Sequence, residues 1–597
     1  MNKTDIFTNR NKDLKLNEVT LKNSHSIFGT LRLLSFISIL ILIFLIIKNP
    51  KSMIVLVGLF LFTILFIFFL IHDISISTEL KKIKRLLLIN DKYIKRIDGT
   101  WTEFEDIGED FKDLEHPYSN DLDIFGTNSL FQLINTTKTF LGRQKLIKLL
   151  KSPELNTVTI EKRQKAVKEL SGKIEFCENL EDEGMSNTKI SNDTNTLLGY
   201  IEDLNDTFKS YVKTGINVLP IITIIFCILA LTFKMPILYY TLLFLFLLHA
   251  LINVISLLKV YPVLNSMETF NNDFATYGNI LKLIEKENFK DPYLCELRDN
   301  LFIKDKASNI LKKLDTIISA INFRSNFLLY IVLNLLFFWD YRCLFYLESW
   351  KDKYGTLVRK YLETAADFEV ISSLATISHL DSNLCYPTFS ITNTKINASE
   401  LGHPLILATD RIYNDVKLKN NIFIVTGSNM SGKTTFLRTI GINLVLAYTG
   451  AQVCANTMDC GLLKIFTSMR ISDDLSKGLS TFYVELTRIK TILDFLPQKE
   501  PMLFLIDEIF RGTNSNDRII GAKTVLKNLD KEWCCGLIST HDFELCDLEK
   551  LNSGRIKNYH FREDYIDNKI HFDYKLRDGR SDTTNAKYLM KMVGIDI

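Results

Sequence analysis

The stretch NIFIVTGSNMSGKTTFLR, residues 421–438, decides how the last third of this chain folds. An apolar, β-rich run leads into the pattern G-x-x-x-x-G-K-[ST], which Gly427, Gly432, Lys433 and Thr434 satisfy. The glycines let the backbone wrap so that consecutive N–H groups face one phosphate, and the following helix adds the positive end of its dipole. The motif therefore predicts a strand, a phosphate-binding loop and a helix.

This loop is predicted to bind ATP together with Mg²⁺. Lys433 is expected to reach the β- and γ-phosphates, and Thr434 is expected to ligate the Mg²⁺ ion. The predicted nucleotide contacts within the loop are Gly427, Ser428, Asn429, Met430, Ser431, Gly432, Lys433, Thr434 and Thr435.

Two further strand ends are expected to supply polar side chains to the same site. The run PMLFLIDEIFRGTNSNDR, 501–518, indicates a buried strand that ends at Asp507 and Glu508, where ligands of parallel sheets bind. Asp507 is predicted to complete the Mg²⁺ shell, and Glu508 to orient the attacking water or accept its proton. The alternative is a pair of helix-capping carboxylates. His541 follows the strand GLIS and is predicted to contact the γ-phosphate, although a lone histidine is more often structural.

Four uncharged apolar runs are predicted to cross a membrane as two helical hairpins. Residues 33–47 and 53–71 are joined by the short turn KNPKS, and residues 214–233 and 235–258 are interrupted only by Lys234. Buried core helices are the alternative for each run. The high mean hydropathy of +0.09 in a chain with 24% charged residues is consistent with membrane spans averaged with soluble domains.

Two apolar runs are shorter than the roughly 20 residues that a span needs. The first of the four is flanked by Arg32 and Lys48, whose apolar stems allow their charges to reach the interface. Residues 326–339 contain only 14 uncharged residues before Asp340 and are predicted to form a core helix outside the membrane.

Charge and cysteine usage place the rest of the chain in the cytoplasm. Lys and Arg residues gather on both flanks of the first hairpin, at Arg10, Lys12, Lys15, Lys22, Lys81, Lys82, Lys84 and Arg85. The ten cysteines include no C-x-x-C pair, which argues against a zinc site or a disulfide framework. With a net charge of +3, no polybasic nucleic-acid arm dominates the composition, so any basic surface must be local.

Several blocks of this sequence resemble the MutS family of ABC-type ATPases. Beside the phosphate loop, IFTSMRISDDLSKGLSTFYVELTRIKTIL at 465–493 is similar to the family's signature block, LFLIDEIFRGTN to its Walker B motif and STHDFEL to its switch histidine. LGHPL at 401–405 and YND at 413–415 match the entrance to the same domain. Upstream, 129–170 and 367–378 resemble parts of the family's helical core.

The resemblance implies further contacts and a dimer. It assigns Ser480 to the γ-phosphate of the opposite subunit, so a homodimer with composite sites is expected. Arg411 stands where repair members commonly have an aromatic on adenine, so Arg411 or Tyr413 would have to cover the base. The DNA-probing domain with its Phe-x-Glu motif has no counterpart in the first 120 residues. The tripeptide at 176–178 fits the three letters but is taken as a coincidence.

The predicted fold is an α/β P-loop (ABC-type) ATPase domain at the C-terminus, an all-α helical core or lever domain, and two transmembrane helical hairpins. The expected boundaries are a cytoplasmic tail at 1–29, the first hairpin at 30–73, a linker at 74–120, the helical core at 121–395 with the second hairpin at 214–258, and the ATPase domain at 396–597.

The function expected from these features is a membrane-anchored ATPase whose Mg-ATP cycle moves helical arms in a dimer. DNA binding stays open, because no Lys/Arg cluster with interleaved aromatics marks a nucleic-acid site. The alternatives are a mismatch-repair-related protein acting on DNA at the membrane, a transporter with a fused ABC-type motor, and a scaffold that binds ATP without turnover. The signature LSTFYVEL differs from the LSGGQ of transporters, and the presence of Glu508 argues against the scaffold.

Overall fold

A computed structural model describes residues 3–186, 194–203, 207–268, 270–390, 394–428, 430–470, 481–510, 514–551, 554–566 and 569–581. The chain forms two compact units. Unit 1 comprises Met1–Asn135, Ile147–Ile174 and Ser372–Ile597, and unit 2 comprises Thr136–Leu146 and Glu175–Ile371. Unit 1 therefore contains both the first hairpin and the C-terminal sheets, and unit 2 contains the second hairpin.

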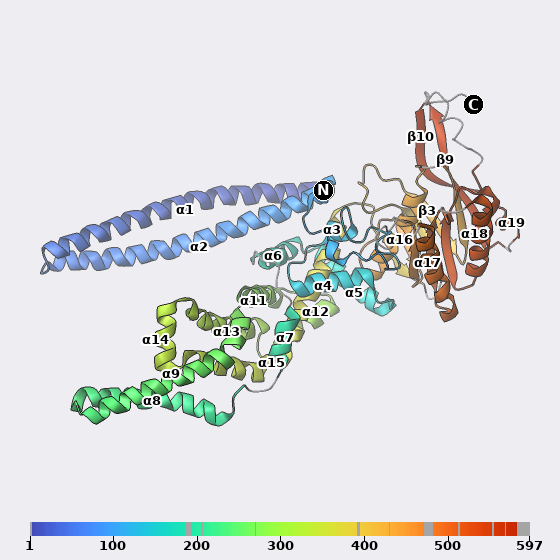
Figure 1. The fold of residues 1–597 in the computed structure, drawn as a ribbon. Coiled ribbons are helices and arrows are strands. Elements are labelled where there is room, and N and C mark those ends of the chain that lie inside the picture. The colour runs from blue at the N-terminus through green and yellow to red at the C-terminus, as the bar shows by residue number, and fades with distance from the viewer. Residues whose placement is uncertain are drawn as a thin grey trace. The chain divides into compact units, whose positions relative to one another are not determined.

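Unit 1 begins with a long helical hairpin of α1 (Lys3–Lys48) and α2 (Met53–Asp98) (Figure 1). Its two far ends lie together, since the rings of Phe7 and Tyr93 stack with centroids 4.7 Å apart. Buried Asp73 pairs with Arg32 at 2.5 Å and with His25 at 2.8 Å. Beyond this pair, towards the turn at 49–52, both helices carry mainly exposed apolar side chains.

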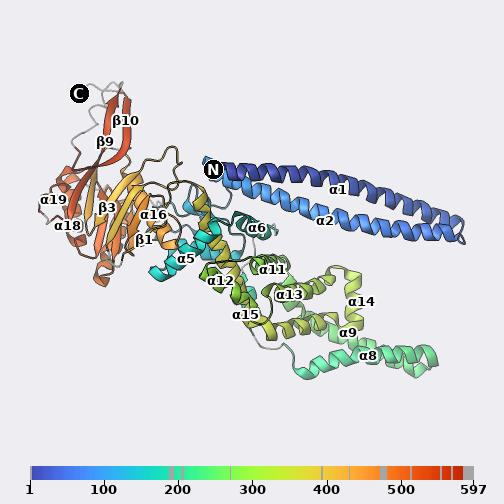
Figure 2. The same ribbon diagram turned by 180° about the vertical axis from the view of Figure 1, so that it is seen from behind.

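The C-terminal part of unit 1 contains a six-stranded sheet in the order β10-β9-β4-β8-β7-β6. Strands β9, β4, β8, β7 and β6 are parallel, and β10 pairs antiparallel with β9 in a ribbon that extends past the other strands (Figure 2). The strand bounds are β4 Ile422–Thr426, β6 Lys464–Ser468, β7 Met502–Asp507, β8 Cys534–Ser539, β9 Ile556–Ile566 and β10 Lys569–Asp578.

Helices cover both faces of this sheet because strand side chains alternate between the two faces. Phe504 and Ile506 of β7 pack in the core formed with α17 (Thr481–Phe495) and α18 (Ser515–Leu529). Leu505 points to the other face, where α16 (Lys433–Thr449) lies so close that a Cβ on Gly441 would meet the Leu505 side chain at 3.0 Å. The short helix α19 spans Leu548–Leu551.

A second, four-stranded sheet stands at the entrance to this domain, in the order β1-β5-β2-β3. Unit 1 also contains the short helices α3 and α5. The bounds are β1 Thr388–Phe389, β2 Lys395–Leu401, β3 Asn414–Lys419, β5 Thr457–Cys460, α3 Leu130–Ile134 and α5 Thr157–Ser171, with α4 (Phe140–Lys151) joining the two units.

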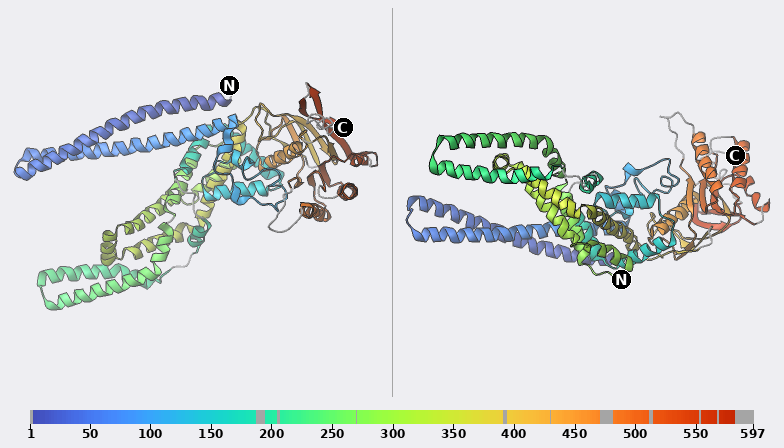
Figure 3. Two further views of the ribbon diagram at one scale, coloured as in Figure 1. Left: turned by 45° about the horizontal axis from the view of Figure 1, so that its top comes forward. Right: turned by 90° about the horizontal axis from the view of Figure 1, so that it is seen from below.

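Over its described residues, the regular secondary structure of unit 2 consists of helices. Helices α8 and α9 form the second hairpin of the chain. These two helices run side by side in both views of Figure 3. The bounds are α6 Ile174–Gly184, α7 Thr194–Glu202, α8 Ser210–Phe233, α9 Pro236–Lys259, α10 Tyr261–Glu268, α11 Asn271–Lys286, α12 Pro292–Asp299, α13 Ala307–Ile321, α14 Phe327–Phe337 and α15 Trp339–Ala375, the last of which continues into unit 1.

The structure agrees with four of the expected apolar helices and corrects the fifth. Four helices, α1, α2, α8 and α9, are long and apolar enough to cross a membrane. The prediction that residues 326–339 form a buried core helix is wrong. In α14 only Asn334 is buried, and most of the large apolar side chains are exposed. The prediction rested on the length of the run, which is too short for a span, but length does not show whether a helix is buried, and a run that is apolar on every side does not mark a packing face.

Candidate functional site

The phosphate-binding loop joins β4 to α16 as the motif predicts. Gly427 and Gly432 have φ angles of 149° and 100°, in the region that favours glycine. A Cβ at Gly432 would also lie 2.9 Å from Cδ1 of Tyr574, so this position requires glycine for space as well. The buried Lys433 ammonium donates to the carbonyl oxygens of Gly427 at 2.8 Å and Ser428 at 2.9 Å. The loop therefore encloses a cation at its centre.

Thr434 and Asp507 meet at the carboxyl edge of the sheet. The Thr434 hydroxyl donates to Asp507 Oδ2 at 2.8 Å, and the Ser539 hydroxyl donates to the other carboxylate oxygen. No group of three or more His, Cys, Asp or Glu side chains able to hold a metal occurs in the described part of the chain. Mg²⁺ ordinarily takes one or two carboxylates plus substrate phosphates, so one hydroxyl and one carboxylate side by side fit this ion.

Glu508 and His541 lie next to this pair and contact each other. The His541 Nε2 atom lies 3.0 Å from Glu508 Oε1 and 3.5 Å from Lys433 Nζ. Glu508 has a φ angle of 50°, and its N–H donates to Ser539 O at 3.1 Å, so the backbone turns sharply just after β7. A carboxylate, an imidazole and an ammonium group thus converge beside the oxygens of Thr434 and Asp507.

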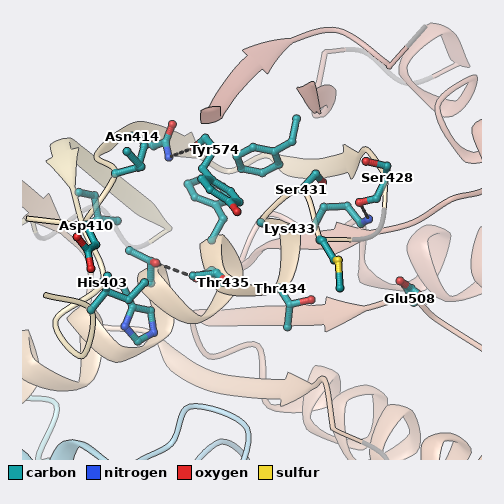
Figure 4. A pocket seen from close by; sticks show the side chains of 18 residues that line it. His403, Asp410, Asn414, Ser428, Ser431, Lys433, Thr434, Thr435, Glu508 and Tyr574 are labelled. Carbon is teal, nitrogen blue, oxygen red and sulfur yellow. Dashed lines mark hydrogen bonds between the residues drawn. The ribbon is translucent and has the colours of Figure 1, made fainter. Parts of the chain in front are cut away.

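A cavity of about 500 Å³ opens next to the loop, within the usual size range of small-molecule sites. At one end it is lined by Ser428, Ser431, Gly432, Lys433, Thr434, Thr435 and Glu508, and at the other by Leu401, His403, Ile406, Asp410, Ile412 and Asn414. In Figure 4 the Tyr574 ring lies between these two groups. The cavity is therefore polar where a phosphate would lie and more apolar at the far end.

The sequence did not point to Tyr574, which comes from β10. The strand pairing is irregular between Phe572 and Leu576, and Tyr574 has a φ angle of 52° in this bulge. The Asn414 amide holds the bulge, since its Nδ2 donates to Tyr574 O at 2.9 Å and its Oδ1 accepts from the Leu576 N–H at 2.8 Å. No sequence pattern marks Tyr574, because its place in the cavity depends on a bulge and on a residue of another sheet.

The two residues expected to cover adenine point away from the cavity. The Arg411 guanidinium is buried and donates to the Asp381 carboxylate, to Cys454 Sγ and to Ile406 O. The Tyr413 hydroxyl also donates to Asp381, at 3.3 Å. Ile412, between them, faces the cavity instead. Neighbouring residues of an extended segment point in opposite directions, so Arg411 and Tyr413 share one side and Ile412 takes the other.

His403 is a neutral part of the cavity wall. Burial lowers its pKa to about 3, and the nearby guanidinium groups of Arg438 and Arg411 contribute to this shift. The ring is therefore uncharged at physiological pH. Among the residues that line the cavity, Lys433 supplies the positive charge near the loop.

Two predicted site residues, Asn429 and Ser480, lie outside the described residues. Helix α17, which follows Ser480, is described from Thr481. Its buried Glu485 accepts a hydrogen bond from the Phe510 N–H, and Arg488 pairs with Asp121 at 2.9 Å. Both side chains thus bind within unit 1 of the same chain.

Two family models match this chain, and both describe MutS domains. The model for MutS domain V matches residues 423–595, and the model for MutS domain III matches residues 112–323. Together they cover more than half of the sequence. The chain belongs to the MutS family.

Similar proteins are DNA mismatch repair proteins MutS of bacteria and archaea. The protein from Lactobacillus johnsonii is 32% identical over 251 residues, which are 41% of this chain and 29% of that protein. The protein from Clostridioides difficile is 36% identical over 211 residues, 34% of this chain and 22% of that protein. The protein from Natronomonas pharaonis is 29% identical over 257 residues, 42% of this chain and 29% of that protein. This MutS-family chain therefore matches less than a third of the length of these relatives.

The position of Tyr574 generates a prediction. Tyr574→Ala is expected to weaken binding of a fluorescent ATP analogue by about tenfold. The variant loses a ring that could stack on the nucleotide base, and a stacked aromatic pair contributes about 0.5–1.5 kcal/mol beyond its buried area. The measurement is a titration of the detergent-solubilised full chain. Tyr574→Phe keeps the ring and should bind within about twofold of the parent. If the Ala and Phe variants bind equally well, the ring has no role in the site.

Proposed function

We propose that this MutS-family protein is a membrane-anchored ATPase that hydrolyses ATP in the cavity beside the phosphate-binding loop. One observation carries the proposal: three different strand ends bring together two adjoining sets of side chains. His541 lies 3.5 Å from Lys433 Nζ and 3.0 Å from Glu508 Oε1, and Thr434, next to Lys433 in sequence, donates to Asp507, next to Glu508. Binding alone would need only Lys433 and Thr434. A carboxylate and an imidazole next to them are the groups that hydrolysis adds.

Each of these side chains has a separate role in the proposed reaction. Lys433 exchanges the two loop carbonyls that it now contacts for β- and γ-phosphate oxygens. Thr434 and Asp507 would hold Mg²⁺, which neutralises phosphate charge when it is bound. Glu508 orients the attacking water and accepts its proton. His541 holds the Glu508 carboxylate in place. It also lies 3.5 Å from Lys433 Nζ, close enough to contact a γ-phosphate bound by that ammonium group.

The nucleotide base is proposed to lie towards Ile406 and Ile412, with Tyr574 against its face. This end of the cavity also contains Asn414 and His403, which offer neutral hydrogen-bonding groups. The proposal replaces Arg411 as the base contact, because its guanidinium is occupied by Asp381, Cys454 and Ile406 O.

The two apolar hairpins are proposed to anchor the protein in a membrane. In the apolar 18-residue windows, 6% of α1 and none of α2 is buried, so most large apolar side chains stay exposed although the two helices contact each other. The ion pair between Arg32 and Asp73 marks where the apolar stretch of the first hairpin begins. A soluble protein rarely exposes apolar surface on this scale, whereas the hydrocarbon of a bilayer would cover it.

A homodimer is proposed because one phosphate loop holds only one side of a triphosphate. Donors for the far oxygens of the γ-phosphate must come from another element. Ser480, in the signature block at 465–493, would supply them from a second copy of the chain. Glu485 and Arg488 anchor α17 within its own subunit.

DNA binding is the second candidate function, because the matched relatives are DNA mismatch repair proteins. The tripeptide Phe176-Cys177-Glu178 does not support base probing in this chain, since all three residues are buried in α6. The test of DNA binding is whether duplex DNA stimulates ATP hydrolysis. Faster turnover with DNA would exclude the transporter alternative.

Hydrolysis by the purified full chain should depend on Mg²⁺ and on the two ends of the site. Lys433→Ala is expected to abolish hydrolysis and weaken nucleotide binding, whereas Glu508→Gln should bind ATP and turn it over about 10²–10³-fold more slowly, as for loss of a general base. Phosphate release is measured with Mg²⁺ and with excess EDTA, with and without duplex DNA at 50 and 200 mM salt.

Matched controls separate these effects from general damage. Lys550→Ala and Glu532→Gln make the same changes at exposed positions and should keep parental turnover. Equal single-turnover rates for Glu508→Gln and the parent would remove Glu508 from its role. If the parent does not hydrolyse ATP under any of these conditions, the ATPase proposal is wrong.

A mixing experiment tests the dimer. Lys433→Ala and Ser480→Arg are each expected to be inactive, but a heterodimer of the two has one doubly damaged site and one intact site. Random mixing should therefore restore about a quarter of parental activity if the sites act independently, as for a catalytic group supplied in trans. Full activity of Ser480→Arg alone, together with a monomeric mass in the presence of ATP, would contradict composite sites.

The proposed topology puts both hairpin turns outside the cytoplasm. The background variant carries Ala at Cys227, Cys295 and Cys385, the cysteines that are not buried. In intact cells an impermeant maleimide should then label Lys51→Cys and Met235→Cys, which lie in or beside the two turns, but should reach Val158→Cys only after lysis. Labelling of Val158→Cys in intact cells would contradict the proposed topology and indicate the opposite orientation.

A further inference from the structure

Helix α14 exposes an apolar surface that the second hairpin does not cover. It contains no charged residue, and seven of its large apolar side chains are exposed: Phe327, Leu328, Leu329, Ile331, Val332, Leu336 and Phe337. Its one buried residue is polar, Asn334. This is the reverse of a soluble helix, which buries apolar side chains and exposes polar ones.

The helix is too short to cross a membrane. Eleven residues at 1.5 Å each extend about 16 Å, against about 30 Å of hydrocarbon. In Figures 1 and 2, α14 stands crosswise to the α8–α9 hairpin and against α9. The preceding helix α13 does not extend it into a span. The two helices meet at an angle of 111°, and α13 buries its own apolar face, including Ile310, Leu314 and Ile318.

Polar side chains of the hairpin hold α14 at its carboxyl end. His249 of α9 is fully buried, and its Nδ1 donates to Leu335 O at 2.7 Å, while its Nε2 lies 3.0 Å from the Thr223 hydroxyl of α8. Asn253 of α9 donates to Asn334 O at 3.1 Å. These contacts fix α14 beside residues that lie well inside the apolar length of α8 and α9.

Protein groups also satisfy the backbone at both ends of α14. The Asn326 side chain accepts from the Leu329 N–H at 3.2 Å, and Arg342 Nε donates to Phe337 O at 2.9 Å. In hydrocarbon each unpaired backbone group costs several kcal/mol, so these partners suit helix ends that lie away from water. Among the charged residues that flank the helix, Arg324 and Asp340 are buried together, with Arg324 Nε 3.5 Å from Asp340 Oδ1, and Arg342 is partly exposed.

From these observations we propose that α14 lies embedded in the lipid bilayer beside the second hairpin, without crossing it. The occupant of its exposed face is lipid hydrocarbon, because α14 contacts α9, whose own apolar side chains are exposed and are proposed to face the bilayer. The inference rests on the proposed membrane location of α8 and α9. It makes unit 2 a membrane module of three elements, with the Asn334, His249 and Thr223 side chains inside and the apolar side chains against lipid.

Three exposed valines allow a matched test. Val332 of α14 is 51% exposed, Val254 of α9 is 55% exposed and Val158 of α5 in unit 1 is 61% exposed. Each is changed to Cys in the background that lacks the three accessible cysteines, and a nitroxide spin label is attached. The full chain is reconstituted in 3:1 phosphatidylethanolamine/phosphatidylglycerol vesicles. Power saturation then compares the accessibility of each label to oxygen, which enters hydrocarbon, with its accessibility to a water-soluble nickel chelate.

Labels at Val332 and Val254 should be relaxed several-fold more by oxygen than by the nickel chelate, and the label at Val158 should show the reverse. Leu328→Cys, one turn before Val332 and 75% exposed, provides a second site on the same face if Val332→Cys lowers the melting temperature.

The outcomes separate this inference from the membrane proposal. If the Val254 label is in lipid while the Val332 and Leu328 labels are reached by nickel, α14 lies in water and the inference alone is wrong. If the Val254 label is also reached by nickel, the membrane location of the second hairpin fails with it. Protection of the Val332 label from both reagents would mean that protein, such as a second copy of the chain, covers α14, and would also overturn the inference.

Discussion

The parallel pairing of β4, β8 and β7 is the constraint on which the proposed chemistry depends. Their register aligns Val425, Ser539 and Asp507 at one edge of the sheet. The chain therefore leaves three neighbouring strands at the same level, towards Lys433, His541 and Glu508 respectively. A shift of one residue in the β7–β8 pairing would turn Asp507 to the other face and separate it from Thr434, since strand side chains alternate. The two helical layers that bury both faces of the sheet make such a shift costly.

The site is also tied to the segment that follows the first hairpin. Asp121 is buried and accepts hydrogen bonds from the Thr467 hydroxyl, the Met469 and Arg470 N–H groups and the Arg488 guanidinium. Upstream, Arg96 near the end of α2 donates to Leu133 O at 2.7 Å. Between them, the Leu130 N–H donates to Asp123 O at 2.8 Å. Within unit 1, contacts therefore connect the first hairpin to Arg470 on one side of Ser480 and to Arg488 on the other.

The proposed membrane location would account for two different distributions of polar groups in this protein. Around the phosphate-binding loop, buried polar side chains such as Thr434, Asp507 and Lys433 gather where a charged ligand would bind. In the α8, α9 and α14 region, the buried polar side chains close backbone groups and one another, and the apolar side chains face outwards. The first arrangement suits water outside and charge inside, and the second suits hydrocarbon outside.

The sequence was sufficient for every feature that depends on neighbours along the chain. The loop from Gly427 to Thr434 has its expected form because its glycines and lysine act within eight residues, and the four long apolar helices follow from composition alone. The sequence also assigned Thr434 and Asp507 to one Mg²⁺ site, which stays a prediction, and in the structure the two side chains are hydrogen-bonded because parallel strands end at a common edge. Local sequence patterns did not predict three features. They are the turn of buried Arg411 away from the cavity, the entry of Tyr574 into the cavity and the exposed face of α14. Each depends on which distant segment packs against it: Asp381 and Cys454 for Arg411, Asn414 for the bulge at Tyr574, and His249 and Asn253 for α14. Such contacts arise only when the chain folds, because local patterns state that a residue is polar or apolar but not which partner will satisfy it.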